Sequence, residues 1–316
     1  MTSSVENNIS SSSEDKFVEP LRFWIFLLLD IPAIACSIFA LYHIFKQRKL
    51  RESLYNHTII LILSFNTVYQ LIDIPLHIQY FRTGAVRPTS TAICLIWWFI
   101  DYGFFFIDLV LLMWTSFERH LLIFHKSLVD NRGKRLLVHY LPLFVLVISM
   151  LCFYIIVIFA PPCHNTFNFS QNYCGTPGCY HSIPILAMIE RIGFAIVPTF
   201  LITILSVALF ARIIWQKHRV QRNVEWRKQR KITINTILMS STYLCFDLPL
   251  SIIDIVHLSG STDWANDALP ALYYLSYFPI MLLPFVCLGS IPELRNKIKI
   301  LNLQQRTHIT PTVAHT

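Results

Sequence analysis

The stretch CLIWWFIDYGFFFIDLVLLMWTSFERHLLIF, residues 94–124, decides the fold class of this chain. Only four of its side chains are charged, and an acid and a base stand side by side near its end, at Glu118 and Arg119. About 20 apolar helical residues suffice to cross the roughly 30 Å hydrocarbon layer of a bilayer. The stretch is therefore predicted to be a transmembrane helix that ends in a charged pair.

Six further apolar stretches are long enough to cross a bilayer. Of the 316 residues, 54% are hydrophobic and 14% charged, and the mean hydropathy of +0.53 exceeds what the core of a water-soluble domain requires. None of the stretches shows the ten-residue alternation of a membrane β-barrel. An all-α membrane protein, a seven-transmembrane helix bundle, is predicted. The expected spans cover residues 23–45, 57–80, 94–124, 136–160, 182–216, 231–258 and 268–291.

The basic residues divide the loops into two sides. Of the 26 Lys and Arg residues, 20 lie in four segments, at residues 46–52, 125–135, 212–231 and 292–316. Cytoplasmic loops are the ones that retain positive charge, so the N-terminus is expected outside the cell. The net charge of +8 then reflects topology and contact with anionic membrane lipid, and nucleic acid is not expected as a partner.

The chain is expected to form one membrane domain with short ends. Residues 1–20 are polar and Ser-rich and lack the apolar core of a cleaved signal peptide, so a disordered extracellular tail is expected. Residues 21–291 would form the bundle. Residues 292–316 would form a short amphipathic helix and a cytoplasmic tail.

The expected outer side carries the features of an extracellular environment. The sequons at Asn8 and Asn168 fall on it, so both are expected to carry glycans, whereas the sequon at Asn56 falls inside. Four of the eight cysteines also lie outside, an even number in an oxidising compartment, which predicts two disulfides. These cysteines are Cys94, Cys163, Cys174 and Cys179.

The charged pair belongs to the motif Glu118-Arg119-His120, and Arg119 lies 25 residues after Cys94. An acid-Arg pair is costly at a membrane boundary unless it has partners or a task. The motif and its spacing resemble rhodopsin-like (class A) G-protein-coupled receptors, in which a Glu/Asp-Arg-Tyr motif ends a helix that a disulfide-bonded Cys begins.

Further landmarks follow in the order of that family, although several are altered. Pro198 lies in the fifth span, as in the family. Asp247 occupies the place of the family's Trp, two residues before Pro249, and Pro284 lacks the Asn and Tyr of the family's Asn-Pro-x-x-Tyr motif. The chain is identified as a divergent member of the family over about residues 20–302.

The resemblance implies a plasma-membrane receptor, not an enzyme, that binds an extracellular ligand and activates a heterotrimeric G protein. Arg119 would be the inner switch, held by Glu118 at rest and released toward the G protein on activation. The expected coupling and switch residues are Glu118, Arg119, His120, Asp247, Pro249 and Pro284. The two prolines are candidate hinges, and tolerated membrane proline explains them equally well. A seven-helix transporter is the alternative, which the absence of repeated halves disfavours.

The resemblance also places a ligand cavity in the outer half of the bundle. The expected ligand-binding residues are Asp101, Tyr102, Glu190, Asp254, His257 and Tyr277. Asp101 matches the acid that pairs with a ligand cation in amine-type and some peptide-type relatives, and Tyr277 matches a Tyr that hydrogen-bonds it. A cationic peptide or amine is expected, with peptide ahead because Leu250 and Ser251 replace an aromatic pair. Alternatively the groups pair internally, Arg191 with one of the acids.

A sodium site is the one cofactor that the resemblance suggests. Asn66 lies nine residues before Pro75, where the family has an Asp, and Asp108 is expected to lie near it from the third span. The amide and the carboxylate would thus have exchanged helices. No other cofactor and no other metal is expected.

Four outer cysteines allow three pairings, and all remain open. Cys94 with Cys179 is favoured, because it places the long loop across the cavity and leaves Cys163 with Cys174 as a small local ring. Cys94 with Cys174 is nearly as well supported.

Overall fold

The computed structural model describes residues 2–124, 131–175, 178–219, 224–261 and 263–290, and every regular element within them is a helix. Seven helical stretches in this part of the chain are long and apolar enough to cross a membrane, and each overlaps a predicted span. They are called spans 1 to 7 and cover Val18–Lys46, Asn56–Thr83, Thr91–Leu121, Arg132–Phe159, Pro184–Arg212, Thr233–Leu258 and Asn266–Gly289. The predicted all-α seven-transmembrane bundle is therefore confirmed.

The spans differ in regularity. Spans 1, 2 and 6 lie within the long helices α1 (Thr2–Lys46), α3 (Leu54–Thr83) and α10 (Val224–Leu258), and α2 (Arg48–Arg51) connects the first two. Each of the other four spans consists of three shorter pieces. Span 3 contains α4 (Thr91–Trp98), η1 (Phe99–Phe104) and α5 (Phe105–Phe124), and span 4 contains α6 (Arg132–Arg135), η3 (Leu136–Tyr140) and α7 (Leu141–Phe159). Span 5 contains α8 (Pro184–Met188), η6 (Ile189–Ile196) and α9 (Val197–Arg219), and span 7 contains η7 (Asn266–Ala268), α11 (Leu269–Leu275) and α12 (Phe278–Ser290). The pieces η1, η3 and η6 are π-helical.

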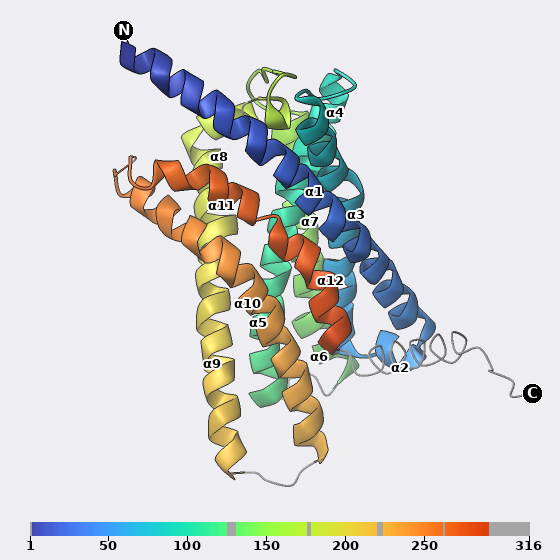
Figure 1. Ribbon diagram of the computed structural model, residues 1–316. Coiled ribbons are helices and arrows are strands. Elements are labelled where there is room, and N and C mark those ends of the chain that lie inside the picture. Colours follow the sequence, from blue (N-terminus) through green and yellow to red (C-terminus); the bar gives the residue numbers. More distant parts are fainter. Residues whose placement is uncertain (1, 125–130, 176–177, 220–223, 262, 291–316) are drawn as a thin grey trace, which may run out of the picture.

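Span 3 occupies the centre of the bundle (Figure 1). In span 3, 67% of the apolar window is buried, compared with 28% in spans 1 and 4. Its helix α5 packs against α3, α7, α9 and α10, while α1 packs along α3 and α12. The central position explains how this span can carry acids, because they are shielded from lipid by the surrounding helices.

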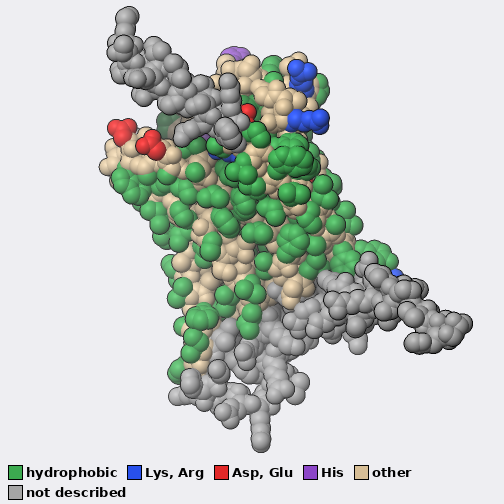
Figure 2. All heavy atoms as spheres, viewed as in Figure 1, with side chains coloured by type: hydrophobic (Ala, Val, Ile, Leu, Met, Phe, Trp, Pro, Cys, Tyr) green, Lys and Arg blue, Asp and Glu red, His purple; other side chains and the backbone are tan. Residues whose placement is uncertain are grey.

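Large hydrophobic side chains cover the outside of the bundle. Figure 2 shows them over the middle of the molecule, with the charged side chains visible on that face gathered near its upper end. Phe144 of span 4 is 65% exposed and Ile185 of span 5 is 71% exposed. A water-soluble protein would bury such residues, whereas lipid tails solvate them, so this surface fits a bilayer.

The described residues include only one of the two ends of the chain. Helix α1 begins at Thr2, so residues 2–20 are helical where a disordered tail is expected. No Gly lies in this segment and its first proline is Pro20, so no strong helix breaker separates it from span 1. The expected helix at residues 292–316 lies outside the described residues.

The two disulfides join Cys94 to Cys174 and Cys163 to Cys179. The favoured pairing of Cys94 with Cys179 is therefore wrong, and the alternative with Cys174 is correct. The reason is a sharp turn in the loop between spans 4 and 5. Tyr173 and Cys174 both adopt left-handed backbone conformations, with φ of 55° and 56°. This turn directs residue 174 toward the start of α4.

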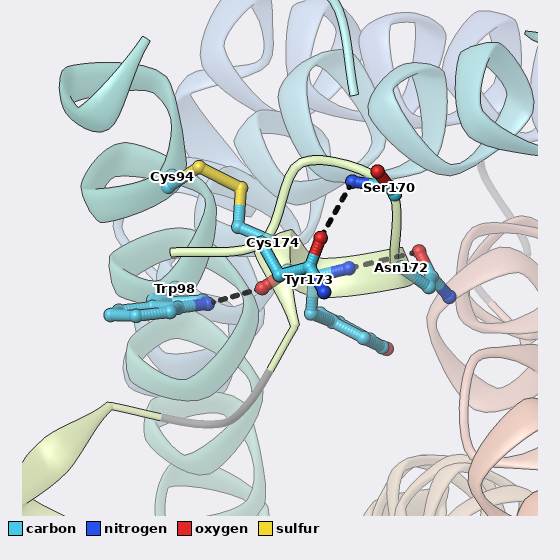
Figure 3. Close-up of a disulfide and its surroundings, with 7 residues drawn as sticks. Cys94, Trp98, Ser170, Asn172, Tyr173 and Cys174 are labelled. Carbon is cyan, nitrogen blue, oxygen red and sulfur yellow. Dashed lines mark hydrogen bonds between the residues drawn. A yellow bond between two sulfur atoms is a disulfide. The ribbon is translucent and has the colours of Figure 1, made fainter. Parts of the chain in front are cut away.

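Hydrogen bonds hold the turn on the end of span 3 (Figure 3). The Trp98 indole donates to the Tyr173 carbonyl over 2.8 Å, and the Asn168 amide donates to the Cys174 carbonyl over 2.6 Å. Gly175 continues the turn at φ 100°, where a Cβ would lie 2.9 Å from the Asn168 side chain. The end of the bundle that carries both disulfides is called the disulfide end.

Candidate ligand cavity

A cavity of about 390 Å³ lies in the disulfide-end half of the bundle. Side chains of spans 2, 3, 5, 6 and 7 line it, together with Tyr173 and His181 of the loop between spans 4 and 5. Four carboxylates and one guanidinium are among the lining groups, those of Asp101, Glu190, Asp247, Asp254 and Arg191. The volume lies within the roughly 300–1,000 Å³ usual for small-molecule sites.

Two of these acids lie on π-helical turns. Asp101 belongs to η1 and Glu190 to η6, and their exposed fractions are 8% and 4%. A π turn contains one more residue than an α turn, so it changes the direction in which the following side chains project. Such turns often occur at functional sites, and here each carries an acid of the cavity wall.

Two tyrosines orient the carboxylate of Asp101. Its Oδ1 atom accepts hydrogen bonds from the Tyr69 hydroxyl at 2.6 Å and from the Tyr277 hydroxyl at 3.2 Å. The Tyr277 contact is the one that the sequence predicts, whereas Tyr69 is not anticipated. Hydrogen bonds to a carboxylate restrict its rotation, so the two tyrosines orient Asp101 for a cationic partner.

Arg191 pairs with an acid of the cavity itself. Its Nε atom lies 3.6 Å from Oδ1 of Asp254, and the two side chains are 44% and 14% exposed. Internal pairing, the alternative that the sequence left open, thus holds for Asp254. Such a partly exposed ion pair contributes little stability, so a ligand can displace it at low cost.

His181 lies beside Glu190 without neutralising it. Its Nε2 atom is 3.7 Å from Oε1 of Glu190. Burial and the nearby positive charge of Arg191 lower the pKa of His181 to about 4. At pH 7 the imidazole is therefore neutral, and it adds no positive charge to the cavity.

Most of the expected ligand-binding residues line this cavity. Tyr102 does so, with its ring 5.6 Å from the ring of His181, and so does Asp247 from the expected switch set. His257 is not part of the lining, and its Nε2 atom is 2.8 Å from the carbonyl of Trp264, in the turn after α10. His257 lies one turn beyond Asp254, at the last turn of α10, and is therefore next to the loop that contains Trp264. Its predicted role in ligand binding remains a prediction.

The expected sodium-site residues are both buried near the middle of the bundle. Asn66 is fully buried and Asp108 is 2% exposed. Within the described residues, neither polar atom of the Asn66 amide has a hydrogen-bond partner, and neither does Oδ1 of Asp108. Buried oxygen atoms of this kind suit a hard cation.

At the other end of the bundle, Glu118 contacts side chains of two neighbouring spans. One carboxylate oxygen contacts Nδ1 of His139 in span 4, and the other accepts a 3.4 Å hydrogen bond from Thr58 in span 2. Both Glu118 and His139 are almost fully buried. The acid of the Glu-Arg-His motif therefore has partners that the sequence does not predict.

The contacts around Glu118 continue into a chain of imidazoles. His139 Nε2 lies 3.3 Å from His57 Nδ1, and His57 Nε2 lies 2.8 Å from the carbonyl of Arg51. The three contacts join the Glu118 carboxylate, the two imidazoles and the Arg51 carbonyl, and each needs one proton to be a hydrogen bond. Two neutral imidazoles carry only two N–H protons between them. A fully hydrogen-bonded chain therefore holds one additional proton, on an imidazole or on Glu118.

The other expected switch residues lie in spans 3, 6 and 7. Arg119 is 3% exposed, and His120 Nε2 is 3.0 Å from the carbonyl of Leu205 in span 5. Pro249 and Pro284 lie inside α10 and α12, respectively. Their predicted roles as hinges remain predictions.

Sequence reasoning missed four buried polar residues, namely Tyr69, Asp73, His77 and His139. A signal for two of them was present, because Asp73 and His77 are four residues apart and must share a face of a membrane helix. For His139 and Tyr69 the sequence held no comparable sign, since each acts on a partner in another span.

The fold and the site define a class of protein. Seven spans, a disulfide-anchored loop at the end of span 3 and a polar cavity beneath it make a membrane receptor bundle. Consistent with this, the family model of the 7 transmembrane receptor (rhodopsin family) matches residues 37–286, or 250 of the 316 residues. The chain belongs to this family and is a class A G-protein-coupled receptor. No curated protein sequence matches it significantly.

Proposed function

We propose that this receptor binds a cationic extracellular ligand, a basic peptide rather than an amine, and activates a heterotrimeric G protein. The composition of the cavity wall carries the proposal. Four carboxylates face one guanidinium there, and the imidazole of His181 is neutral at pH 7. A cation entering the cavity therefore meets more acidic than basic side chains.

Asp101 and Glu190 are the acids best placed for the ligand. Arg191 forms an ion pair with Asp254, whereas neither Asp101 nor Glu190 forms a salt bridge with Lys or Arg in the described part of the chain. Two hydroxyls already orient Asp101. A ligand ammonium or guanidinium would complete its coordination with a charge-assisted hydrogen bond.

The size of the cavity favours the end of a peptide. About 390 Å³ admits an amine or one or two side chains of a longer ligand, and the rest of a peptide would lie on the loop above. That loop contains aromatic rings, including those of Phe167 and Tyr173, which pack on the buried rings of Trp98 and Trp97. Rigid aromatic surfaces of this kind are typical of peptide contacts.

Residues at the two ends of the bundle support an orientation with the disulfide end outside the cell. Disulfides persist in the extracellular compartment, and Asn168 beside them is exposed as a glycosylation site requires. Asn56 at the other end is 3% exposed, and its amide donates to the Leu50 carbonyl. The G protein would then meet the end that carries Arg119, and Asn66 and Asp108 would offer oxygen ligands to sodium.

The proposal can be tested with a ligand screen in cells. Cells expressing the chain and a promiscuous Gα are challenged with biogenic amines and basic peptides, and second-messenger output is recorded. Asp101→Asn should raise the half-maximal ligand concentration about 10- to 100-fold, since a hydrogen bond to a charged group contributes about 1.5–3 kcal/mol. Asp267→Asn is the matched control, because Asp267 is an exposed acid outside the cavity lining.

Two results would contradict the proposal. Equal responses of the wild type and Asp101→Asn to every active ligand would remove Asp101 from the binding site. Activation by anionic ligands alone would reject a cation-binding cavity.

A further inference from the structure

Three side chains beside the cavity bring potential metal ligands together. One ligand atom from each of Asp73, His77 and Asp101 lies within 4.8 Å of the other two. Asp73 and His77 lie one turn apart on α3, and their Oδ2 and Nε2 atoms are 3.5 Å apart. Asp101 reaches them from η1 of span 3, which packs on α3.

The pair on α3 lacks the hydrogen bonds that buried polar groups normally form. Asp73 is fully buried and His77 is 1% exposed. Within the described residues, neither oxygen of Asp73 and neither ring nitrogen of His77 makes a hydrogen bond of normal geometry. Trp97 and Tyr69 lie near Asp73, and Asn172 lies near His77, close enough only for weaker hydrogen bonds. Carboxylates buried in this way need a cation or a proton.

The surroundings hold the three groups in place and exclude water. Five aromatic rings surround the imidazole of His77 at 4.7 to 6.1 Å between centroids, those of Phe26, Phe81, Trp97, Tyr173 and Tyr277. The hydroxyls of Tyr69 and Tyr277 both bind Oδ1 of Asp101. Hydrogen bonds from neighbouring groups to a ligating carboxylate are a regular feature of metal sites.

The ligand types and the spacing match zinc best. Zinc in proteins takes imidazole nitrogen and carboxylate oxygen at about 2.0–2.2 Å in a tetrahedron, which places neighbouring donor atoms about 3.4 Å apart. The distance between His77 Nε2 and Asp73 Oδ2 is 3.5 Å, and all three donor atoms lie within 4.8 Å of one another, so a small shift of side chains would complete the coordination. Calcium takes about six to eight oxygen ligands and magnesium prefers oxygen ligands and several waters, and a buried site with three protein ligands, one of them nitrogen, suits neither.

The geometry points to a divalent transition-metal site formed by Asp73, His77 and Asp101, with zinc as the natural occupant. Three protein ligands leave one tetrahedral position for a water or another donor atom. The metal would connect spans 2 and 3 through Asp101, which also lines the ligand cavity, so zinc and a cationic ligand would compete for this carboxylate. The site exists whatever ligand the cavity takes, so its test needs no agonist.

Zinc titration of the purified receptor tests the site directly. The full chain in lipid nanodiscs is stripped with a chelator, titrated with zinc chloride and followed by calorimetry. We expect one saturable site, weakened by about 100-fold or more in His77→Gln and Asp73→Asn, since even outer partners of metal ligands contribute about 10- to 100-fold. Tyr69→Phe, which keeps all three ligands, should weaken zinc about 10-fold. His257→Gln, an outer-half histidine outside the cluster, should bind like the wild type.

X-ray absorption on the zinc-loaded wild type provides a measurement that does not depend on any variant folding. It should show one imidazole nitrogen and oxygen ligands at about 2.0–2.2 Å. Absence of a saturable zinc site in the wild type, a spectrum without imidazole, or unchanged affinity in folded His77→Gln protein would each overturn the proposal.

Discussion

Replacing His139 by Leu tests whether its buried contact with Glu118 holds spans 3 and 4 together. The two side chains are 2% and 3% exposed, so water cannot replace the lost partner. Thr58 still donates its 3.4 Å hydrogen bond to the other carboxylate oxygen. Glu118 would thus remain buried with a single weak donor in place of two, and the contact with His57 would be lost as well.

The magnitude follows from the burial of the pair. Breaking a buried pair by removing one partner costs about 3–5 kcal/mol, and the remaining Thr58 bond points to the lower end, about 3 kcal/mol. Glu118→Gln keeps an acceptor for His139 and should cost about 1.5 kcal/mol. The double variant leaves no buried charge without a partner. We therefore expect it to lose about 2.5 kcal/mol of unfolding free energy, well below the sum of the two single losses. The coupling energy would be about 2 kcal/mol.

Thermal unfolding of the purified, ligand-free receptor provides the measurement. At about 2 °C per kcal/mol, His139→Leu should lower the midpoint by about 6 °C. His257→Leu, which removes a contact with one backbone carbonyl at the other end, is the matched control and should shift it by about 2 °C or less. Single effects of Glu118→Gln and His139→Leu that add within about 0.5 kcal/mol would refute the reasoning.

Three further predictions concern the disulfide end and its orientation. Cys94→Ser should destabilise the receptor more than Cys163→Ser, because the two disulfides close loops of 80 and 16 residues, which contribute about 4.5 and 3 kcal/mol through chain entropy. Thermal unfolding of the two variants measures the order, and the reverse order would contradict the prediction. His181 has its pKa lowered from 6.5 to about 4, so the unfolded chain gains a proton first as the pH falls. Stability should therefore be complete above pH 6.5 and fall toward pH 4 by at most about 3 kcal/mol, and a His181→Asn protein with the same pH profile of unfolding would rule this out. Asn168→Gln should increase electrophoretic mobility by removing a glycan while Asn56→Gln leaves it unchanged, and the opposite result would invert the proposed topology.

The fold could be predicted well because crossing a membrane is a one-dimensional requirement. Each expected span overlaps an observed one, since length and hydropathy alone decide whether a helix can cross. The π-helical pieces η1 and η6 were not foreseen. They depend on how neighbouring spans pack, and no local residue pattern marks them.

The site was predicted in part. Asp101 and Glu190 could be singled out because a carboxylate in a membrane span is costly and therefore seldom without a role. The contact of His257 with the carbonyl of Trp264, outside the cavity lining, could be found only from the structure. The partnership of Glu118 with His139 joins residues 21 apart in different spans, and no spacing rule predicts it.

The sequence by itself determined the number of spans, their approximate positions and the residues that are expensive to bury. These properties depend on composition along the chain, because transfer into lipid is a property of each segment. Only the tertiary structure decided that Tyr69 and Tyr277 meet Asp101, that Asp73 and His77 lie beside it, and that Cys174 bonds to Cys94. Those contacts depend on the rotation of each helix about its axis and on the left-handed turn at residue 173. Packing between distant segments sets both, and no single segment carries that information.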